Sequence, residues 1–478
     1  AVADSICEGL LRWTEDNELV PCLAKTVPSF ESDGVTLKVE LKSGVKFHDG
    51  TELTASDVKY TFERMFKPET GALSTSYFTD IKGAKEMLAG TATELEGLSV
   101  EDDTHLTFTL TVPNVAFVSA LGISYACIFP KTACEAAGKD WGTGTHLIGT
   151  GKYKLAENDD TTAVKLVRFD DYHDGTPALD EIRITYYDDD NTKLLAYKNG
   201  DLDWCDLPSS LFKQYSDDAE IKDQITSYPT LGVNFINLNL KEGNGLDDVK
   251  VRQALSLAIN RQELVDTFAH GNGIACSGWL PQQISGFDKN APVFEYDVEK
   301  AKSLLAEAGV SDLKLTGKVR KASEKLLVAV QDYWQKAGIT LDVQVEDNAV
   351  WNQDWAGGNL QVTTLGWYAL FADGSQHLDT YFSSKNAAKK SSFYNNADFD
   401  AYLEDARKET DKDKRAEDYK AADNLLTRTD YATLPLFWPK NSFVAKDYVK
   451  GAKVGNLIYH FFDLDIDASS ADYKAPED

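Results

Sequence analysis

The region from 297 to 347 limits the possible folds most strongly, because its hydrophobic pattern alternates between helical and strand periods. Residues 297–309 predict a helix that begins at an aspartate cap and ends at a glycine. A short strand is predicted at 313–315, a second helix at Leu326–Ala337, and a strand with alternating apolar residues at Ile339–Val345. Helix, strand, helix and strand with such short connections imply parallel strands joined by right-handed crossovers. The chain is therefore predicted to be an α/β protein.

Length and charge narrow the class further. A chain of 478 residues is too long for one compact core, so two or three domains are expected. The 49 Lys and Arg against 77 Asp and Glu give a net charge of −28. Nucleic acid is therefore excluded as a partner, because phosphate binding needs a basic face. The sequence also has no apolar run of about 18 residues, so no transmembrane helix is predicted.

Motifs for catalysis, metal binding and phosphate binding are missing from the sequence. The 7 histidines do not form an H-E-x-x-H motif, and there is no G-x-S-x-G nucleophile elbow. The glycines of Gly149–Tyr153 lack the spacing of a phosphate loop. We therefore predict a binding protein rather than an enzyme, with no metal and no cofactor.

The stretch Val35–Phe66 predicts a strand, a tight turn and a helix that opens with a capping box at Thr54–Asp57. The sequence GVKFHDGTELTASDVKYTFERM within this stretch closely resembles a motif of the family 5 extracellular solute-binding proteins, the dipeptide- and oligopeptide-binding subunits of ABC importers. A second match is DDVKVRQALSLAINRQELV, within a helix predicted at Asp247–His270. The resemblance extends over nearly the whole chain.

The resemblance implies a two-lobed, type II periplasmic-binding-protein-like fold of the large peptide-binder cluster, with a ligand cleft between the lobes. We expect lobe I at 1–275 plus 441–478, with an extra small subdomain at about 43–150, and lobe II at 276–440. Other expected elements are a helix at 4–13, helical structure at Phe399–Arg428 and a final strand at Leu457–Ile466.

Aromatic residues concentrate in Val350–Phe382, where they could line a ligand site or fill the core. Within it, GWYALFADGSQHLDTYF resembles the inter-lobe segment of the family. In peptide binders a carboxylate three residues after the tryptophan grips the ligand's α-ammonium, and Leu370 occupies that position here. Asp373 matches the next acidic position and is a possible substitute. The predicted ligand-binding residues are Trp367, Tyr368, Ala369, Leu370, Asp373, Trp351 and Trp355.

Six cysteines form an even set without zinc-ligand spacing. Pairing by closeness in sequence predicts Cys127–Cys134 and Cys7–Cys22, which leaves Cys205–Cys276. Buried free thiols are the alternative. Disulfides would indicate an oxidising compartment.

The resemblance implies a monomeric substrate-binding protein that captures a peptide or related small solute and delivers it to an ABC permease in the membrane. It also implies an extracellular or periplasmic location, with an upstream first strand and an upstream lipid anchor that holds the protein at the outer face of the membrane. A hydrolase, or a sensor or chaperone with the same fold, is the alternative. The missing carboxylate at position 370 leaves open blocked or longer peptides, oligosaccharides, opines and metal chelates as ligands.

Overall fold

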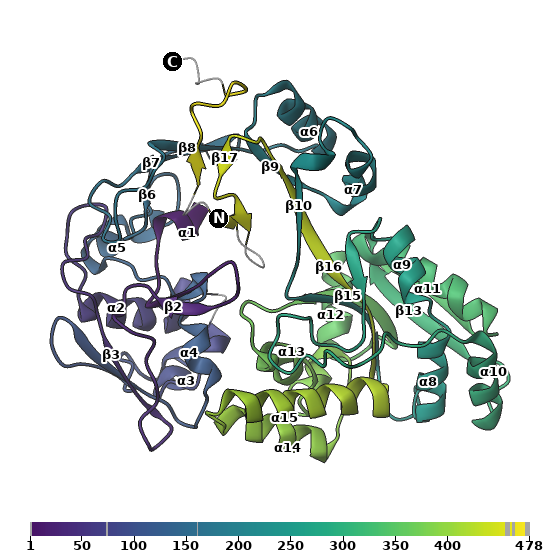
Figure 1. Cartoon of the computed structure of the whole chain (residues 1–478). Coiled ribbons are helices and arrows are strands. Elements are labelled where there is room, and N and C mark those ends of the chain that lie inside the picture. Colours follow the sequence, from purple (N-terminus) through teal and green to yellow (C-terminus); the bar gives the residue numbers. More distant parts are fainter. Residues whose placement is uncertain (1, 73–74, 160, 455–458, 461–463, 474–478) are drawn as a thin grey trace. The chain divides into compact units, whose positions relative to one another are not determined.

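The computed structural model describes residues 2–72, 75–159, 161–454, 459–460 and 464–473. The chain forms two compact units (Figure 1). Unit 1 comprises 1–205 and 444–478, and unit 2 comprises 206–443. These units divide at 205/206 and 443/444. The lobe boundaries at 275/276 and 440/441 stay predictions.

Unit 2 begins well before residue 276 because of strand pairing. Strands β11 (Gly232–Leu238) and β12 (Gly273–Ala275) both pair with β16 (Thr433–Ala445) in the main sheet of unit 2. The glycine-rich stretch 271–278 contains β12 and therefore belongs to this sheet. The small subdomain at about 43–150 stays a prediction.

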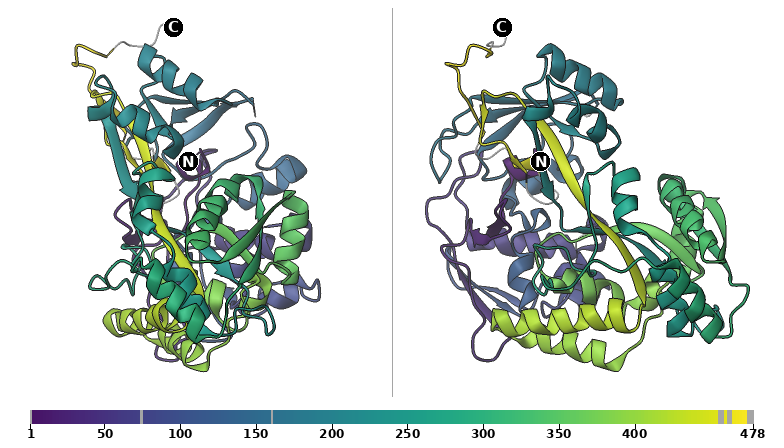
Figure 2. Two further views of the ribbon diagram at one scale, coloured as in Figure 1. Left: turned by 90° about the vertical axis from the view of Figure 1, so that its right-hand side faces the viewer. Right: turned by 45° about the vertical axis from the view of Figure 1, so that its right-hand side comes forward.

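Unit 2 is built on one mixed sheet. Six of its strands run in the order β10-β16-β11-β15-β13-β14, and β9 and β12 pair with β16, the long strand drawn in yellow-green in Figure 2. The strands are β9 (Trp204–Leu207, across the boundary), β10 (Ile225–Pro229), β11, β12, β13 (Lys314–Arg320), β14 (Thr340–Glu346), β15 (Val362–Tyr368) and β16.

Both faces of β11 are buried, as is typical of the central strand of an α/β sheet. Ile236 and Leu238 belong to one core cluster, and Val233 and Phe235 belong to another. The other members of both clusters come from helices, from the other strands and from connecting segments of unit 2. The helices of unit 2 are α7 (Ser209–Ser216), α8 (Val249–Leu257), α9 (Arg261–Thr267), α10 (Val298–Glu307), α11 (Glu324–Lys336), α12 (Asn348–Gly357), α13 (Gly374–Phe382), α14 (Ala397–Lys408) and α15 (Lys412–Asn424), with short helical turns at Lys222–Gln224, Lys321–Ser323 and Ala387–Lys390 and a π-turn at Leu425–Thr429.

The helix–strand alternation predicted for 297–347 is confirmed. The Asp297 carboxylate accepts a hydrogen bond from the Lys300 backbone N–H at 2.9 Å and begins α10. Strands β13 and β14 pair in parallel, with α11 between them in the sequence. The helix caps and the hydrophobic periods were sufficient to predict these elements, because segments that are neighbours in the sequence pack against one another.

Two long helices expected from the sequence are each divided. The helix predicted at Asp247–His270 is α8 followed by α9, because the Asn260 side chain caps a new helix by accepting the Glu263 N–H at 3.1 Å. The helical stretch predicted at Phe399–Arg428 is α14 followed by α15, with the Asp411 side chain capping the second helix. Figure 1 shows α14 and α15 side by side.

Unit 1 holds several small sheets, in the orders β1-β2, β3-β5-β4, β6-β7-β8, β17-β20 and β18-β19. Its strands are β1 (Leu11–Trp13), β2 (Leu19–Pro21), β3 (Thr36–Glu40), β4 (Leu98–Val100), β5 (His105–Thr109), β6 (Tyr153–Asn158), β7 (Ala163–Arg168), β8 (Glu181–Thr185), β17 (Val449–Lys450), β18 (Lys453–Val454), β19 (Tyr459–His460) and β20 (Asp465–Ile466). Its helices are α1 (Val2–Ile6), α2 (Ala55–Phe66), α3 (Ala84–Leu88), α4 (Ala116–Ala120), α5 (Lys131–Ala137) and α6 (Asp190–Asn199), with short 3-10 turns at Pro68–Thr70, Thr75–Tyr77, Ser124–Ala126 and Gly138–Asp140.

The strand, turn and capped helix predicted for Val35–Phe66 are confirmed as β3 and α2. The Thr54 backbone N–H donates to the Asp57 carboxylate at 3.0 Å, which is the expected capping interaction. The side chains of Val58, Phe62 and Phe66 are buried on one face of α2. This stretch is part of the unit 1 core.

The helix predicted at 4–13 is wrong beyond its first turn. Helix α1 ends at Ile6, and Leu11 already belongs to β1. The backbone of Cys22 donates to the Leu10 carbonyl, so strand-like pairing to the following segment replaces helical bonds. The final strand predicted at Leu457–Ile466 lies partly outside the described residues, which include only β19 and β20 of it.

Within the described residues, every helix is too short or too polar to cross a bilayer. This agrees with the absence of a long apolar run in the sequence.

Candidate functional site in unit 2

Strand β15 carries the predicted ligand segment out of the sheet. Its side chains are buried from Val362 to Leu365 and become partly or largely exposed from Gly366 to Tyr368. Trp367 is paired with Val233 and Tyr368 with Gly232 on β11. The segment therefore reaches the surface of unit 2 on a rigid strand end rather than on a loop.

The Tyr368 ring packs against two glycines, Gly232 and Gly366. A Cβ atom added to Gly232 would come within 2.4 Å of the Tyr368 ring, and one added to Gly366 would come within 3.0 Å. Any side chain at Gly232 would displace this ring. Tyr368 is 40% exposed, so it offers an aromatic surface that a ligand could contact.

The indole of Trp367 is fixed by helix α13. Its Nε1 donates to the Gln376 carbonyl at 2.9 Å, and its ring meets the buried ring of Tyr381 edge-on, with centroids 5.1 Å apart. Trp367 remains only partly buried. A held aromatic side chain of this kind loses little conformational entropy when it binds a ligand.

Asp373 is occupied by structural contacts. Its carboxylate accepts the Ser375 N–H at 2.9 Å and caps α13, and Arg415 of α15 approaches it with Nη1–Oδ2 at 2.7 Å and Nη2–Oδ1 at 2.9 Å. The Tyr419 hydroxyl lies 3.2 Å from Oδ1. Burial alone would lower the pKa of Arg415, but the Asp373 carboxylate outweighs it and the pKa is raised. The bidentate Arg415 pair argues against the prediction that Asp373 replaces the missing amine-binding carboxylate.

The two tryptophans of α12 differ in environment. Trp351 is 2% exposed, and its Nε1 donates to the Lys318 carbonyl at 3.2 Å, so it fills the core of unit 2. Trp355 is only partly buried and stacks on Trp351, with centroids 5.5 Å apart. The alternative that the aromatic residues fill the core therefore describes Trp351, while Trp355 reaches a partly open position.

A lysine that sequence reasoning missed joins these aromatic rings. The Lys390 Nζ lies 4.7 Å from the ring centroid of Trp355, 5.1 Å from that of Trp367 and 5.9 Å from that of Tyr381. The side chain is half-buried, and burial, followed by the neighbouring Lys389, lowers its pKa. No sequence pattern indicates this contact, because Lys390 is 35 residues from Trp355. We refer to Lys390, Trp355, Trp367 and Tyr381 as the lysine cage.

Comparison with protein families gives a match over residues 18–389 to the bacterial extracellular solute-binding proteins, family 5 Middle. The chain belongs to this family. The oligopeptide-binding protein OppA of Bacillus subtilis (strain 168) is 27% identical over 466 residues, which cover 93% of this chain and 84% of OppA. Heme-binding protein A of Haemophilus influenzae is 27% identical over 436 residues, which cover 86% of this chain and 77% of that protein.

The fold is shared with solved structures of similar binding proteins. The unliganded open form of the periplasmic murein tripeptide binding protein MppA superposes with a TM-score of 0.84 at 24% identity, covering 97% of this chain and 92% of MppA. The predicted two-lobed, type II periplasmic-binding-protein-like fold class is confirmed. The names of these relatives are names of solute-binding proteins rather than of enzymes.

In this family member, Ala369 and Leu370 follow β15 directly. Ala369 is 1% exposed, and its N–H donates to the Leu231 carbonyl at 3.1 Å, so its side chain faces the interior. Leu370 is partly buried. The position expected to carry a carboxylate is therefore apolar, at the point where the chain leaves the sheet.

The six cysteines of this solute-binding protein are all buried and none forms a disulfide, so the predicted bridges Cys7–Cys22, Cys127–Cys134 and Cys205–Cys276 are not formed. The Cys22 thiol donates instead to the Glu8 carboxylate at 3.3 Å. Cys127 packs in one core cluster with Cys7 rather than against Cys134. Cys205 and Cys276 belong to different compact units.

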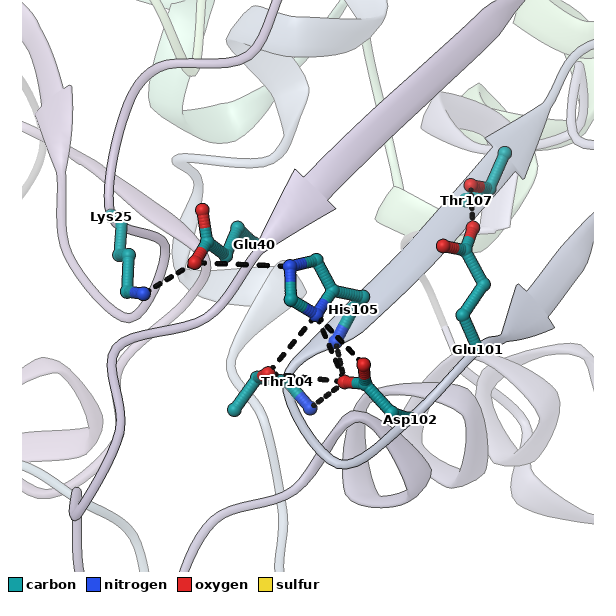
Figure 3. Close-up of polar contacts among 7 residues, drawn as sticks. All are labelled: Lys25, Glu40, Glu101, Asp102, Thr104, His105 and Thr107. Carbon is teal, nitrogen blue, oxygen red and sulfur yellow. Dashed lines mark hydrogen bonds and ion pairs between the residues drawn. The ribbon is translucent and has the colours of Figure 1, made fainter.

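In each of two polar clusters of unit 1, a carboxylate lies within hydrogen-bond distance of a histidine. The buried Glu8 carboxylate lies 2.8 Å from His173 Nε2 and accepts the hydroxyls of Tyr172 and Thr150 at 2.7 and 2.9 Å. On the sheet surface, Asp102 lies 2.9 Å from His105 Nδ1 and raises the pKa of that histidine (Figure 3). We interpret both clusters as structural.

A hollow elsewhere in unit 2 and the possible metal-binding side chains were also considered as candidate sites. A hollow of about 850 Å³ lies on α14 and α15 and is lined mostly by charged side chains, without any predicted ligand residue. Among the described residues, no group of three His, Cys, Asp or Glu side chains is arranged to hold a metal ion.

Proposed function

We propose that this protein is the substrate-binding component of an ABC importer that captures a peptide or a related small solute. In this proposal the solute binds between two closing lobes and is delivered unchanged to a membrane permease. The observation that carries the proposal is the rigid, partly exposed pair Trp367 and Tyr368 at the end of β15, in a member of a solute-binding family. Closure would select a pre-existing closed state that the ligand favours.

The proposed ligand contacts are Trp367, Tyr368, Leu370 and Trp355, which are partly buried or exposed in unit 2. Ala369, Asp373 and Trp351 are buried and would support these side chains without touching the ligand. The peptide class is supported by relatives named for oligopeptide and murein tripeptide binding. A relative named for heme binding shows that ligands differ within the family.

We propose further that the protein acts as a monomer in the extracellular or periplasmic space, held at the membrane by an upstream lipid anchor. Capture without chemistry is proposed because sequence motifs for nucleophilic or metal-assisted hydrolysis are absent.

Native mass spectrometry of the purified protein tests the ligand class, because a co-purified solute reports its own mass. A panel of di- to pentapeptides should then bind in calorimetry and be recovered intact after incubation. Cleaved peptides would favour the hydrolase alternative. Binding without permease-dependent uptake in cells would favour a sensor or chaperone.

A further inference from the structure

The lysine cage places an ammonium group against aromatic faces next to a proposed ligand contact. Lys390 Nζ is nearest to the ring of Trp355, at 4.7 Å, and lies 5.1 Å from the ring of Trp367. These distances are within the range of favourable cation–π attraction. The buried Tyr381 ring is the third neighbour, at 5.9 Å.

The backbone around Lys390 is held firmly. Its carbonyl accepts the Trp355 indole N–H and the Asn237 amide, each at 3.1 Å. The next residue, Ser391, has a left-handed φ of 51° and donates its hydroxyl to the Trp355 carbonyl at 2.8 Å. A non-glycine residue in this conformation is uncommon, and here it is fixed by side-chain bonds. The backbone position from which the Lys390 side chain extends is therefore fixed by the fold.

Lys390 has no anionic partner among the described residues. Burial and Lys389 lower its pKa, and no carboxylate acts against them. Lys318, another partly buried lysine of unit 2, provides the contrast, because its Nζ lies 2.9 Å from Glu346 and 2.6 Å from Asp354. In a chain with 77 acidic residues, a half-buried lysine without a carboxylate leaves one strong interaction unmade.

We propose that the Lys390 ammonium binds a carboxylate of the ligand, with Trp355 and Trp367 holding the ammonium in place. This inference rests on the proposed function and narrows it to ligands that carry a negative charge. A charge-assisted hydrogen bond in a partly dehydrated site is stronger than one at an open surface.

The apolar side chain at position 370 agrees with this charge preference. Leu370 offers no carboxylate to an ammonium of the ligand, and Asp373 is already paired with Arg415. A ligand with a carboxylate and without a free amine therefore suits the described side chains best. Peptides with a blocked amino terminus and a free carboxylate are the class that this predicts.

The experiment compares three blocked peptides by calorimetry: N-acetyl-trialanine, its carboxamide, and N-acetyl-Ala-Asp-Ala carboxamide. The first and third carry one carboxylate each, at the terminus and on a side chain. The proteins compared are the wild type, Lys390→Met, Lys390→Arg and Lys389→Met. Lys389 is the matched control, because it is an exposed neighbour with no cage contact.

We expect the wild type to bind at least one carboxylate-bearing peptide about ten- to hundredfold more tightly than the carboxamide, the range for one hydrogen bond to a charged group. Lys390→Met should abolish this preference, while Lys390→Arg and Lys389→Met should keep it. The stronger of the two carboxylate peptides identifies which carboxylate is bound.

Equal binding of all three peptides, or an unchanged preference in Lys390→Met, would overturn the inference and leave the proposed function intact. Failure of every peptide to bind the wild type, with longer and unblocked peptides also inactive, would overturn both. If Lys390→Met does not fold, as judged by circular dichroism, the comparison of Lys390→Arg with the wild type decides. A charge preference lost in that variant would contradict the inference.

Discussion

Arg415 and Lys390 are both cations that lie against aromatic rings in unit 2, but only Arg415 has a carboxylate partner. The Arg415 guanidinium lies 5.2 Å from the Tyr419 ring and forms a bidentate pair with Asp373. The Lys390 ammonium lies among three rings without an anionic partner in the described chain. The pKa of Arg415 is raised, and that of Lys390 is lowered.

This difference separates two uses of a buried charge. A satisfied pair holds two helices together, since Asp373 caps α13 and Arg415 belongs to α15. A cation without a carboxylate partner in the protein remains available to form an ion pair with a ligand. Single substitutions can show whether a charged position stabilises the fold or is kept for a ligand.

The largest expected effect is on the paired cation. Arg415→Met leaves the Asp373 carboxylate buried without its partner, so the free energy of unfolding should fall by about 3–5 kcal/mol. Denaturant unfolding measures this loss. The double variant with Asp373→Asn should lose clearly less than the sum of the two single variants, because the pair acts as one interaction. A loss below about 1 kcal/mol for Arg415→Met would contradict the buried-pair interpretation.

Asp423 offers a third case, a buried carboxylate that relies mainly on hydrogen bonds. It accepts the backbone N–H groups of Trp279 and Leu280 at 2.9 and 3.1 Å. Burial nonetheless raises its pKa from 3.8 to about 6. The folded protein therefore holds this proton more tightly than the unfolded chain, and the stabilisation is complete below pH 3.8 and lost as the pH rises through 6.

The measurement is the stability difference between the wild type and Asp423→Asn as a function of pH. Relative to the variant, the wild type should lose about 2.4 kcal/mol between pH 4 and pH 7, since one pKa unit corresponds to about 1.4 kcal/mol and the unfolded carboxyl is already partly ionised at pH 4. The asparagine variant removes this titration while keeping one acceptor for the two N–H groups. A difference that stays flat across this pH range would show that Asp423 titrates normally.

These contrasts also show how far the sequence could be interpreted. The caps of α2 and α10 and the parallel pair β13–β14 were predicted because each depends on residues close in sequence. The division of α8 from α9 was missed, although the Asn260 cap is local, because one apolar stripe continued through it. The pair of Asp373 with Arg415 spans 42 residues, and no periodic pattern connects two such positions. The same reason hid Lys390, whereas the aromatic segment around Trp367 is recognisable from its composition and stays a predicted ligand site.

A smaller effect is expected at the missing carboxylate. Leu370→Asp should raise the affinity for di- or tripeptides with a free amino terminus by about tenfold, because one new partly buried charge pair can contribute about 1.4 kcal/mol. Calorimetry across a peptide panel measures this change. N-acetylated versions of the same peptides should show no gain, and Leu370→Asn is the uncharged control. The absence of any gain for free amines would contradict the role assigned to position 370.

The smallest expected effect is the change in protein stability when Lys390 of the lysine cage is replaced. Lys390→Met should change the free energy of unfolding by less than about 1 kcal/mol, because the methionine stem can pack against the same rings and no charge loses a partner. Trp355 and Trp367 keep their own hydrogen bonds to the Lys390 and Gln376 carbonyls in this variant. Denaturant unfolding without ligand measures the effect, with Lys389→Met as the control. A loss as large as that of Arg415→Met would show that the cage is a structural element, since a cation kept for ligand binding contributes little to the stability of the empty protein.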